Sequence, residues 1–380
     1  MLTSDSLVAP ARLPREIYLA NASHGLPSAP VFKALQDYLV EEAEWGGAHA
    51  VERHEEQFAA GYAAAARLIG ADTDEVAFLE SGNRALQALI LSLRLRPGDH
   101  VLVDRTCWGG TLDMLADLPG VVVDVMSTDA HGRADVAATR ATVHPATRCI
   151  LLTWCPATSG IVNPAEEVGV LAREIGAFYL IDACQLLGQR PVDVKRLGCH
   201  GLAASGRKWL RGPRGTSLLY ASREFLSARP AFMADQLGRL RKDARSHEQG
   251  EASYAGRLAL GVAIQGALTL GLDAIAAQLS EVSGQLREGL RALSCVNVVE
   301  SGEDLSAIVA FSIEGLSPEY VLAELARQGI RIGTLSATYA PLDMAARGLD
   351  VVLRAAPQVY TSERDIAALL QAIARLAAMA

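Results

Sequence analysis

The sequence has no uninterrupted run of about 18 apolar residues, the length that a membrane-spanning helix needs. Its first residues, from Met1 to Asp5, also lack the basic segment and apolar core of a secretory signal. We therefore expect a cytoplasmic protein that makes no contact with a membrane.

Cysteines are few and scattered. The six cysteines stand at positions 107, 149, 155, 184, 199 and 295, with neither the spacing of a metal site nor the density of a disulfide framework. We expect reduced thiols and no metal site.

An excess of positive charge is also absent. The formal net charge is −8, so nothing in the overall balance would attract a nucleic acid or an anionic membrane surface. The arginines near residue 210 are a local exception, and we expect them to serve a small ligand. With 380 residues, half of them apolar, the chain is long enough for more than one hydrophobic core, and two domains are expected.

Strand-like and helix-like segments alternate from about residue 76 to residue 220. This alternation predicts an α/β fold with a mostly parallel central sheet flanked by helices, followed from about residue 276 by a smaller α+β domain. The expected division is a large domain over residues 17–255 and a small domain of residues 1–16 and 256–380, joined by a long helix over about 254–275.

A lysine with a distinctive setting follows the apolar run 201–204. Lys208 has a hydroxyl residue, Ser205, three positions before it, and a stretch rich in Gly, Pro and Arg after it that is not regular structure. A lysine amine becomes nucleophilic near neutral pH when burial or neighbouring cations disfavour its ammonium form. The nearby cations are Arg207, Arg211 and Arg214. Taken alone, the stretch is equally compatible with a basic surface loop.

A carboxylate ends the strand-like run before this lysine. Residues 177–181 are apolar, aromatic or β-branched and lead to Asp182, which predicts a buried strand that delivers a carboxylate where open α/β sheets bind ligands. An aspartate there needs a cationic partner. A pyridinium nitrogen supplies one, and a lysine bonded to the same ring would complete a pyridoxal phosphate site.

The two stretches read D-A-C-Q at residues 182–185 and S-G-R-K-W-L-R-G-P-R-G at residues 205–215. Together they resemble the class V aminotransferase group of fold type I pyridoxal phosphate enzymes, and the resemblance extends over nearly the whole chain. Stretches such as E-A-E-W-G-G and L-R-A-A-P-Q-V-Y-T-S-E look most like isopenicillin N epimerase-like proteins and the carbon–sulfur lyases of the ergothioneine pathway. The resemblance implies pyridoxal 5'-phosphate as cofactor and a homodimer with its active site at the interface.

A strand-like run at 76–80 leads through a glycine-containing turn into a helix expected over 84–95. The free N–H groups and the dipole of a helix N-terminus favour a phosphate. The candidate phosphate residues are Ser81, Gly82, Asn83 and Arg84, together with Ser205. A plain strand-to-helix connection is the alternative. Family members often have a hydroxyl residue in place of Arg84, which leaves open whether its side chain faces the phosphate.

Contacts to the cofactor ring follow from position and from the resemblance. Trp108 follows the strand-like run 100–103 and precedes two glycines, which suits stacking on the ring, although a place in the core is the alternative. Asp182 would hold the ring nitrogen protonated, and Gln185 would face the ring hydroxyl. Related enzymes have a polar residue near the ring oxygen in the loop after residue 153. Because an alanine stands close to that place here, Thr158 is the expected contact.

The resemblance also implies the substrate and partner contacts. Arg354 follows an apolar run, where a guanidinium is costly unless it meets a carboxylate, and the family uses such an arginine for the substrate α-carboxylate. His24 and Gly25 lie in an opening segment that borders the substrate in the family. Ser253 is expected to reach the phosphate of the partner subunit. The alternatives are an edge-strand ion pair for Arg354, a polar turn for His24 and Gly25, and a solvated loop for Ser253.

The expected reaction is β-elimination from a cysteine S-conjugate or its sulfoxide, which gives a thiol or sulfenic acid, pyruvate and ammonia. A cysteine desulfurase needs a cysteine on a mobile loop, and residues 333–338 contain none, which argues against that activity. An aminotransferase, an epimerase or racemase, or a decarboxylating oxidative deaminase would use the same small-molecule amino-acid site, and an inert scaffold of this fold is the non-enzyme alternative.

Overall fold

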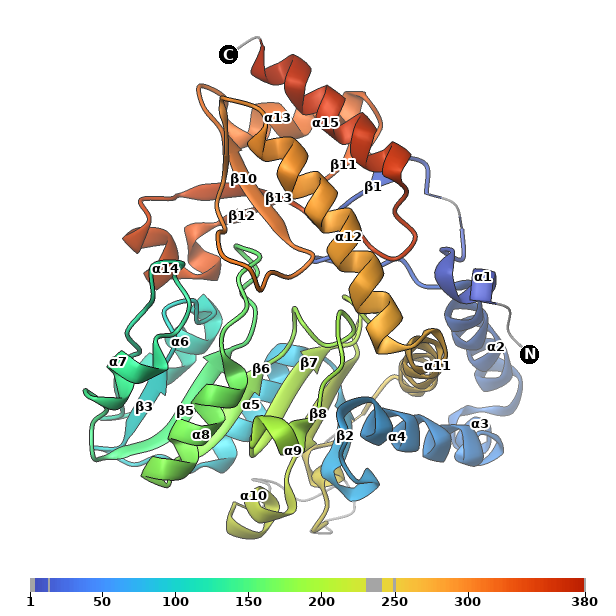
Figure 1. Cartoon of the computed structure of the whole chain (residues 1–380). Coiled ribbons are helices and arrows are strands. Elements are labelled where there is room, and N and C mark those ends of the chain that lie inside the picture. The colour runs from blue at the N-terminus through green and yellow to red at the C-terminus, as the bar shows by residue number, and fades with distance from the viewer. Residues whose placement is uncertain (1–3, 13, 230–240, 249–250, 379–380) are drawn as a thin grey trace.

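The computed structural model describes residues 4–12, 14–229, 241–248 and 251–378. Its centre is a seven-stranded sheet in which β8 runs opposite to the other six strands, so the expected mostly parallel sheet is confirmed (Figure 1). In spatial order the strands are β2 (Val76–Leu79), β8 (Ser217–Ala221), β7 (Gly201–Ser205), β6 (Phe178–Asp182), β5 (Thr147–Thr153), β3 (His100–Val103) and β4 (Val122–Val125).

Helices cover both faces of this sheet because successive strand residues point to opposite sides. In β5, Ile150 and Leu152 join one apolar cluster, while Cys149 and Leu151 join the other. The first cluster is covered by α4 (Glu55–Ile69), α8 (Ala165–Ile175), α9 (Val194–Leu197) and α11 (Tyr254–Leu270). The second is covered by α5 (Gly82–Ser92), α6 (Gly109–Ala116) and α10 (Arg223–Ala228).

A second sheet lies above the carboxyl ends of the parallel strands (Figure 1). It is antiparallel, with the order β12 (Gly333–Ser336), β13 (Val351–Ala355), β10 (Val309–Ile313) and β9 (Val296–Val298). Its apolar core is shared with α12 (Leu272–Arg291), α13 (Pro318–Arg327) and α15 (Glu363–Ala377). A two-stranded parallel pair, β1 (Ile17–Tyr18) and β11 (Ile330–Arg331), joins the amino-terminal segment to this part of the molecule.

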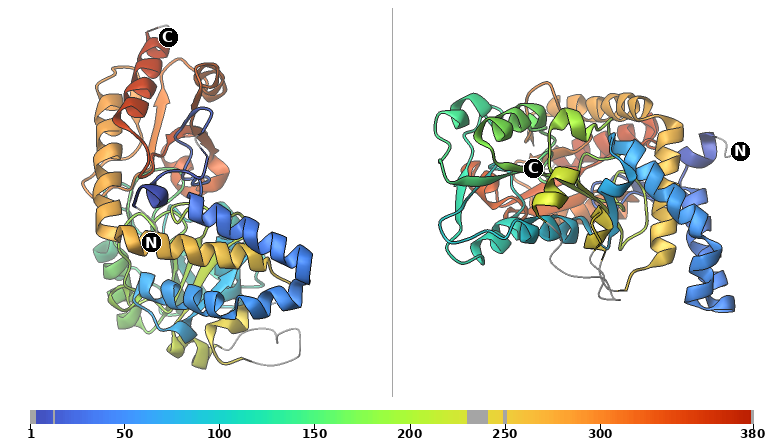
Figure 2. Two further views of the ribbon diagram at one scale, coloured as in Figure 1. Left: turned by 90° about the vertical axis from the view of Figure 1, so that its right-hand side faces the viewer. Right: turned by 90° about the horizontal axis from the view of Figure 1, so that it is seen from below.

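Shorter elements and the amino-terminal helices complete the fold. The helices α2 (Ala29–Trp45) and α3 (Gly47–Arg53) project with α4 from one side of the molecule (Figure 2). The remaining elements are α1 (Ser4–Val8), η1 (Thr73–Glu75), α7 (Val136–Arg140), η2 (Ala244–His247), η3 (Ala337–Tyr339) and α14 (Pro341–Ala346).

The single linking helix expected over 254–275 is wrong. α11 ends at Leu270, α12 begins at Leu272, and the two helices meet at an angle of 81°. Gly271 lies between them with φ of +85°, a conformation that favours glycine and ends a helix. In the part of the chain that the structure describes, no single helix is long and apolar enough to span a membrane. The bent pair of α11 and α12 has the length and composition of a span only when the two helices are taken together. The division into domains at residue 255 stays a prediction.

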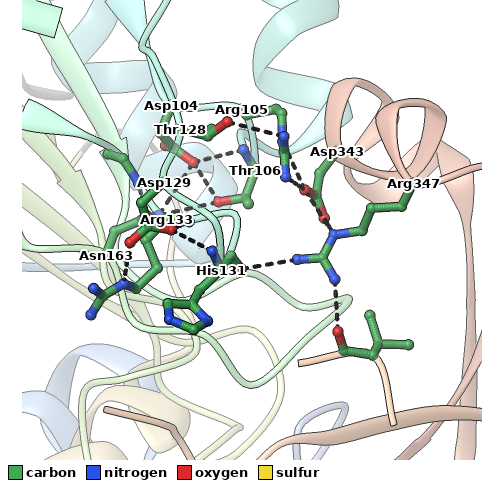
Figure 3. A network of polar contacts seen from close by, with 12 residues as sticks. Asp104, Arg105, Thr106, Thr128, Asp129, His131, Arg133, Asn163, Asp343 and Arg347 are labelled. Carbon is green, nitrogen blue, oxygen red and sulfur yellow. Dashed lines mark hydrogen bonds and ion pairs between the residues drawn. The ribbon is translucent and has the colours of Figure 1, made fainter. Parts of the chain in front are cut away.

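A buried ion network joins α14 to two loops of the seven-stranded sheet (Figure 3). Asp343 in α14 is 1% exposed and accepts hydrogen bonds from Arg105 Nε at 3.0 Å and Arg347 Nε at 3.2 Å. Arg105 follows β3 and also donates to Thr128 Oγ1 at 3.1 Å, while Arg347 donates to the carbonyl of His131 at 3.3 Å. Asp343 therefore fixes α14 against two loops of the seven-stranded sheet.

A second buried cluster in Figure 3 holds the carboxyl ends of β3 and β5 together. Asp104 accepts from the backbone N–H groups of Thr106 at 2.8 Å and Thr153 at 2.6 Å. Desolvation raises the pKa of Asp104 to about 6, although these hydrogen bonds oppose the shift. Asn163 donates to the Thr153 carbonyl at 2.7 Å and so ties the next loop to the same point.

We predict that Asp343→Ala lowers the free energy of unfolding by about 3 kcal/mol, because it leaves two partly buried guanidinium groups without their anion. Urea denaturation would measure the change. The matched control is Glu16→Ala, which breaks the exposed Glu16–Arg331 pair and should cost less than about 1 kcal/mol. Equal losses in the two variants would contradict the bridging role of Asp343.

Candidate active site

A cavity of about 340 Å³ is lined by residues at the carboxyl ends of the parallel strands and by residues of the second sheet. Most residues singled out from the sequence line it: Ser81, Gly82, Asn83, Trp108, Asp182, Gln185, Ser205, Lys208 and Arg354. The others, Arg84, Thr158, Ser253, His24 and Gly25, are not among its lining residues. The cavity thus brings together side chains from both sheets and from the amino-terminal segment.

Lys208 reaches the cavity from the turn that follows β7. Burial is the main cause that lowers the pKa of its amine, and the charges of Arg207 and Arg354 lower it further, while Cys184 and Asp182 oppose the shift. A lowered pKa makes the neutral, nucleophilic amine more abundant.

The expectation that all three neighbouring arginines act on this lysine is wrong for Arg211. Its guanidinium turns away and donates to the carbonyls of Leu26 at 2.8 Å, Leu7 at 2.8 Å and Ala9 at 3.1 Å. Arg214 lines the cavity, while the guanidinium groups with the largest effect on the pKa of Lys208 are those of Arg207 and Arg354.

Asp182 stands at the carboxyl end of β6, beside β7, as the sequence predicts. Its Oδ1 atom accepts from the N–H of Cys184 at 2.9 Å, which fixes the orientation of the carboxylate. Gln185 follows one turn later and is 4% exposed. Its amide donates to the carbonyl of Ala22 at 3.1 Å and accepts from Trp209 Nε1 at 3.0 Å, so its orientation is set from two sides.

The turn after β2 has the form expected of an anion cradle. Ser81 is the N-cap of α5, and its Oγ accepts from the N–H of Arg84 at 3.1 Å. A Cβ at Gly82 would lie 2.3 Å from Cys184 Sγ and 2.8 Å from Ser205 Oγ, so only glycine lets these segments meet. The Arg84 side chain lies outside the cavity and approaches Glu80 at 3.5 Å. Its predicted contact with a phosphate is therefore not supported, because the side chain points along the exposed side of the helix.

Trp108 lies at the cavity, directly before α6, and belongs to neither apolar cluster of the sheet. A Cβ at Gly110 would lie 2.4 Å from the Trp108 ring, and one at Gly109 would lie 2.0 Å from the carbonyl oxygen of Thr338. The two glycines thus admit the indole ring on one side and the η3 turn on the other.

Arg354 enters the cavity from β13 and is 2% exposed. Its guanidinium donates to the carbonyl of Ala157 at 3.0 Å and to Ser23 Oγ at 2.5 Å, while its buried Nε has no partner among the described residues. Desolvation lowers its pKa to about 10, against the smaller opposing effect of Tyr339. This arrangement is ready for an anionic partner.

Thr158 is not among the lining residues of the cavity, and its contact with the cofactor ring stays a prediction. Thr158 is 1% exposed and its hydroxyl has no hydrogen-bond partner in the described part of the chain, whereas Ala157 lines the cavity. The turn that lets the Ala157 carbonyl meet Arg354 leaves the Thr158 side chain outside the cavity.

His24 and Gly25 lie beside the lysine turn rather than in the cavity wall. The N–H of Gly25 donates to the carbonyl of Arg207 at 2.9 Å. A Cβ on Gly25 would lie 2.3 Å from the carbonyl oxygen of Lys208. Burial, with the charges of Arg214 and Arg207, lowers the pKa of His24. Ser253 caps α11 through the N–H of Gly256 at 3.1 Å, and its contact with a partner subunit stays a prediction.

Several lining residues were not expected from the sequence. Ser23 comes from the amino-terminal segment, and Leu335 and Tyr339 come from β12 and η3. The sequence indicates Leu335 only by its place in the stretch 333–338, which contains no cysteine, and Tyr339 follows that stretch directly. Cys155 and Cys184 also line the cavity, and burial raises the pKa of each thiol to about 12.

These residues fit pyridoxal phosphate. The N-cap of α5 and Ser205 offer donors for a phosphate, Asp182 offers a carboxylate for a ring nitrogen, and Lys208 offers an amine with a lowered pKa. The unpartnered Nε of Arg354 offers a place for a substrate carboxylate.

The chain is similar to known proteins over nearly its whole length. The sequence profile of the family described as "Aminotransferase class-V" matches residues 17–369. A probable cysteine desulfurase of Methanothermobacter thermautotrophicus is 27% identical and covers 96% of this chain and 95% of its own length. A second, from Pyrococcus abyssi, is 25% identical and covers 95% of this chain and 94% of its own.

Solved structures share the fold. A cysteine desulfurase of Escherichia coli matches with a TM-score of 0.90 and 21% identity, covering 100% of this chain and 99% of its own. The cystine C-S lyase C-DES, in a complex with its product cysteine persulfide, matches with a TM-score of 0.84 and 20% identity, covering 94% and 97%. The expected fold class, fold type I, is confirmed.

We predict that Gly25→Ala destabilises the protein by about 1–3 kcal/mol, because the added methyl group would collide with the backbone of Lys208. The same shift of the lysine turn should weaken cofactor binding. Urea denaturation and cofactor titration would measure the two effects.

The matched control is Gly284→Ala in α12, where an added Cβ meets nothing within 4 Å. This variant should gain up to about 1 kcal/mol from helix propensity. If Gly25→Ala behaves like Gly284→Ala, the close approach to Lys208 does not constrain the site.

Proposed function

The chain belongs to the class-V aminotransferase family of pyridoxal phosphate enzymes, and from this premise we propose that it is a carbon–sulfur lyase. Its substrate is a cysteine S-conjugate or the sulfoxide of one. β-Elimination breaks the bond between Cβ and sulfur and gives a thiol or a sulfenic acid, with pyruvate and ammonia as the other products. The observation that carries the proposal is a cavity with Lys208, Asp182 and Arg354 but without a thiolate.

Arg354 holds the α-carboxylate of the substrate in this proposal. A guanidinium that is 2% exposed and has no carboxylate partner among the described residues gains most from a bound anion. Its unpartnered Nε supplies a donor for that anion, while the contacts to Ala157 and Ser23 fix its direction.

Lys208 and Asp182 bind the α-proton of the substrate and the proton of the ring nitrogen, respectively. Pyridoxal phosphate, when bound, draws electron density away from the substrate α-carbon. Lys208 Nζ accepts the α-proton, and the lowered pKa of this amine favours the neutral form that can do so. Asp182 keeps a proton on the ring nitrogen, and the Cys184 N–H holds its carboxylate in position.

Cysteine desulfuration is the second candidate, because two relatives named above are described as probable cysteine desulfurases. That reaction needs a thiolate that takes sulfur from the substrate. Cys155 and Cys184 line the cavity, but burial raises the pKa of both thiols to about 12, which keeps them protonated. The stretch of β12 and η3 that faces the cavity presents Leu335 and Tyr339 instead of a cysteine. These features support elimination.

We propose further that the enzyme is a homodimer. α2 exposes Leu39, Val40 and Trp45, each more than half accessible, and such apolar side chains favour a protein interface. The exposed Ser253 at the start of α11 is the residue proposed to reach the partner's phosphate.

The proposed reaction predicts a specific set of products. Holoenzyme given S-methylcysteine or its sulfoxide should release pyruvate and ammonia in equal amounts, without carbon dioxide, while Lys208→Ala should lose both the visible cofactor absorbance and turnover. Coupled assays for pyruvate, ammonia and carbon dioxide would measure this. Alanine together with an enzyme persulfide from cysteine would establish desulfuration instead, and an aldehyde with carbon dioxide would establish decarboxylating deamination.

We predict that Arg354→Lys raises KM by about 10- to 100-fold with a smaller change in kcat. The substitution loses a charge-assisted hydrogen bond to the α-carboxylate, worth about 1.5–3 kcal/mol. Steady-state kinetics with one S-conjugate would separate the two constants. An unchanged KM would remove Arg354 from the substrate site.

A further inference from the structure

Three guanidinium groups border the cavity: those of Arg207, Arg214 and Arg354. Among the described residues, none of the three has a carboxylate within 4 Å. Substrate binding through one α-carboxylate accounts for Arg354 alone. The other two cations therefore need a separate explanation.

Arg207 and Arg354 converge on one residue. Arg207 Nη1 donates to the carbonyl of Ser23, and Arg354 Nη2 donates to the hydroxyl of the same serine at 2.5 Å. Desolvation and then the charge of Arg214 lower the pKa of Arg207, and Arg207 in turn lowers that of Arg354. Arg207 is therefore close enough to repel both Arg214 and Arg354, and an anion bound beside Arg207 would relieve that repulsion.

The positive charge gathers on the substrate side of the cavity. Arg214 and Arg207 both act on Tyr18 and His24 in the amino-terminal segment. The cradle at Ser81 and Gly82 is formed instead by backbone N–H groups and by Ser205. Arg207 thus lies beside Ser23 and Arg354, and Arg214 acts on Arg207 and on the same amino-terminal segment.

Acidic residues of the cavity do not neutralise this group. Of its lining residues, only Glu80 and Asp182 carry carboxylates. Glu80 approaches Arg84 at 3.5 Å, and Asp182 is bound to the N–H of Cys184 at the end of β6. The excess of positive charge beside Ser23 is left for a ligand.

We propose that the site selects amino acids whose side chain ends in a second anionic group, such as a carboxylate, held by Arg207 and Arg214 beside the α-carboxylate at Arg354. This inference rests on the proposed function for the placement of the α-carboxylate. For a carbon–sulfur lyase, it makes the substrate a cysteine S-conjugate with an anionic S-substituent. Arg214 is the specificity residue of this pair, because Arg207 is joined directly to Lys208.

The test compares an acid with its uncharged amide. L-2-Aminoadipate and its 6-amide have nearly the same shape and carry no leaving group, so the change in holoenzyme absorbance reports binding without turnover. We expect wild-type holoenzyme to bind the acid at least about tenfold more tightly than the amide, and Arg214→Gln to reduce this preference to about threefold. Arg214→Lys should retain part of the preference, and added salt should weaken it in the wild type.

Arg196→Gln is the matched control, since it removes the same charge from an exposed arginine that pairs with Glu166 outside the cavity. It should leave the preference unchanged. Equal binding of acid and amide, failure of both to bind, or an unchanged preference in Arg214→Gln would overturn the inference. Looser cofactor binding in Arg214→Gln with the preference intact would assign this arginine to the phosphate and also overturn it.

The two proposals fail in different ways. Preference for the acid together with no pyruvate from any S-conjugate would retain the second anion site and overturn β-elimination. Pyruvate from S-methylcysteine together with equal binding of acid and amide would retain β-elimination and overturn the second anion site.

Discussion

The buried guanidinium of Arg211 joins the amino-terminal segment to the turn that carries Lys208. It donates to three backbone carbonyls of residues 7–26 and stacks on Tyr360 with its guanidinium carbon 4.9 Å from the ring centre. Tyr360 in turn donates to Asn21. Because Arg211 lies three residues after Lys208, these contacts bind the amino-terminal segment to the turn that carries the lysine. Its φ of +61°, unusual for a residue with a side chain, shows that the turn is bent to make them.

That arrangement places Ser23 where both sides of the cavity meet. Gly25 contacts the Lys208 backbone so closely that no side chain fits, which brings Ser23 within reach of Arg207 from the large sheet and Arg354 from the small one. Carbonyl and hydroxyl oxygens offset only part of the cost of burying a guanidinium. In the proposed function, a substrate carboxylate neutralises the positive charge that remains, and we expect substrate affinity to depend on the packing around Arg211.

The sequence predicts the parts of the site that depend on local pattern. A β-branched run ending in Asp182 and an apolar run before Lys208 need only strand periodicity to be placed at neighbouring strand ends. Tyr339 reaches the cavity through a three-dimensional contact between segments far apart in the chain, which periodicity does not encode. In the loop after β5 it is Ala157, not the neighbouring Thr158, that lines the cavity, because the direction of a side chain in a loop depends on the backbone turn. The break at Gly271 is a local signal that an Ala- and Leu-rich pattern on both sides obscures.

Reaction choice in this fold must depend on the residues that cover the cavity. The floor is built from the large sheet, with Lys208 and Asp182, and proteins named as desulfurases and as a C-S lyase share the whole fold with this chain. A common fold therefore does not determine which group receives the sulfur. Here the covering segment supplies Leu335 and Tyr339, an apolar and an aromatic side chain that cannot accept sulfur. In the proposed elimination, a sulfur group that leaves the β-carbon meets neither a cysteine nor another acceptor among these covering side chains, and we expect its release into the open cavity.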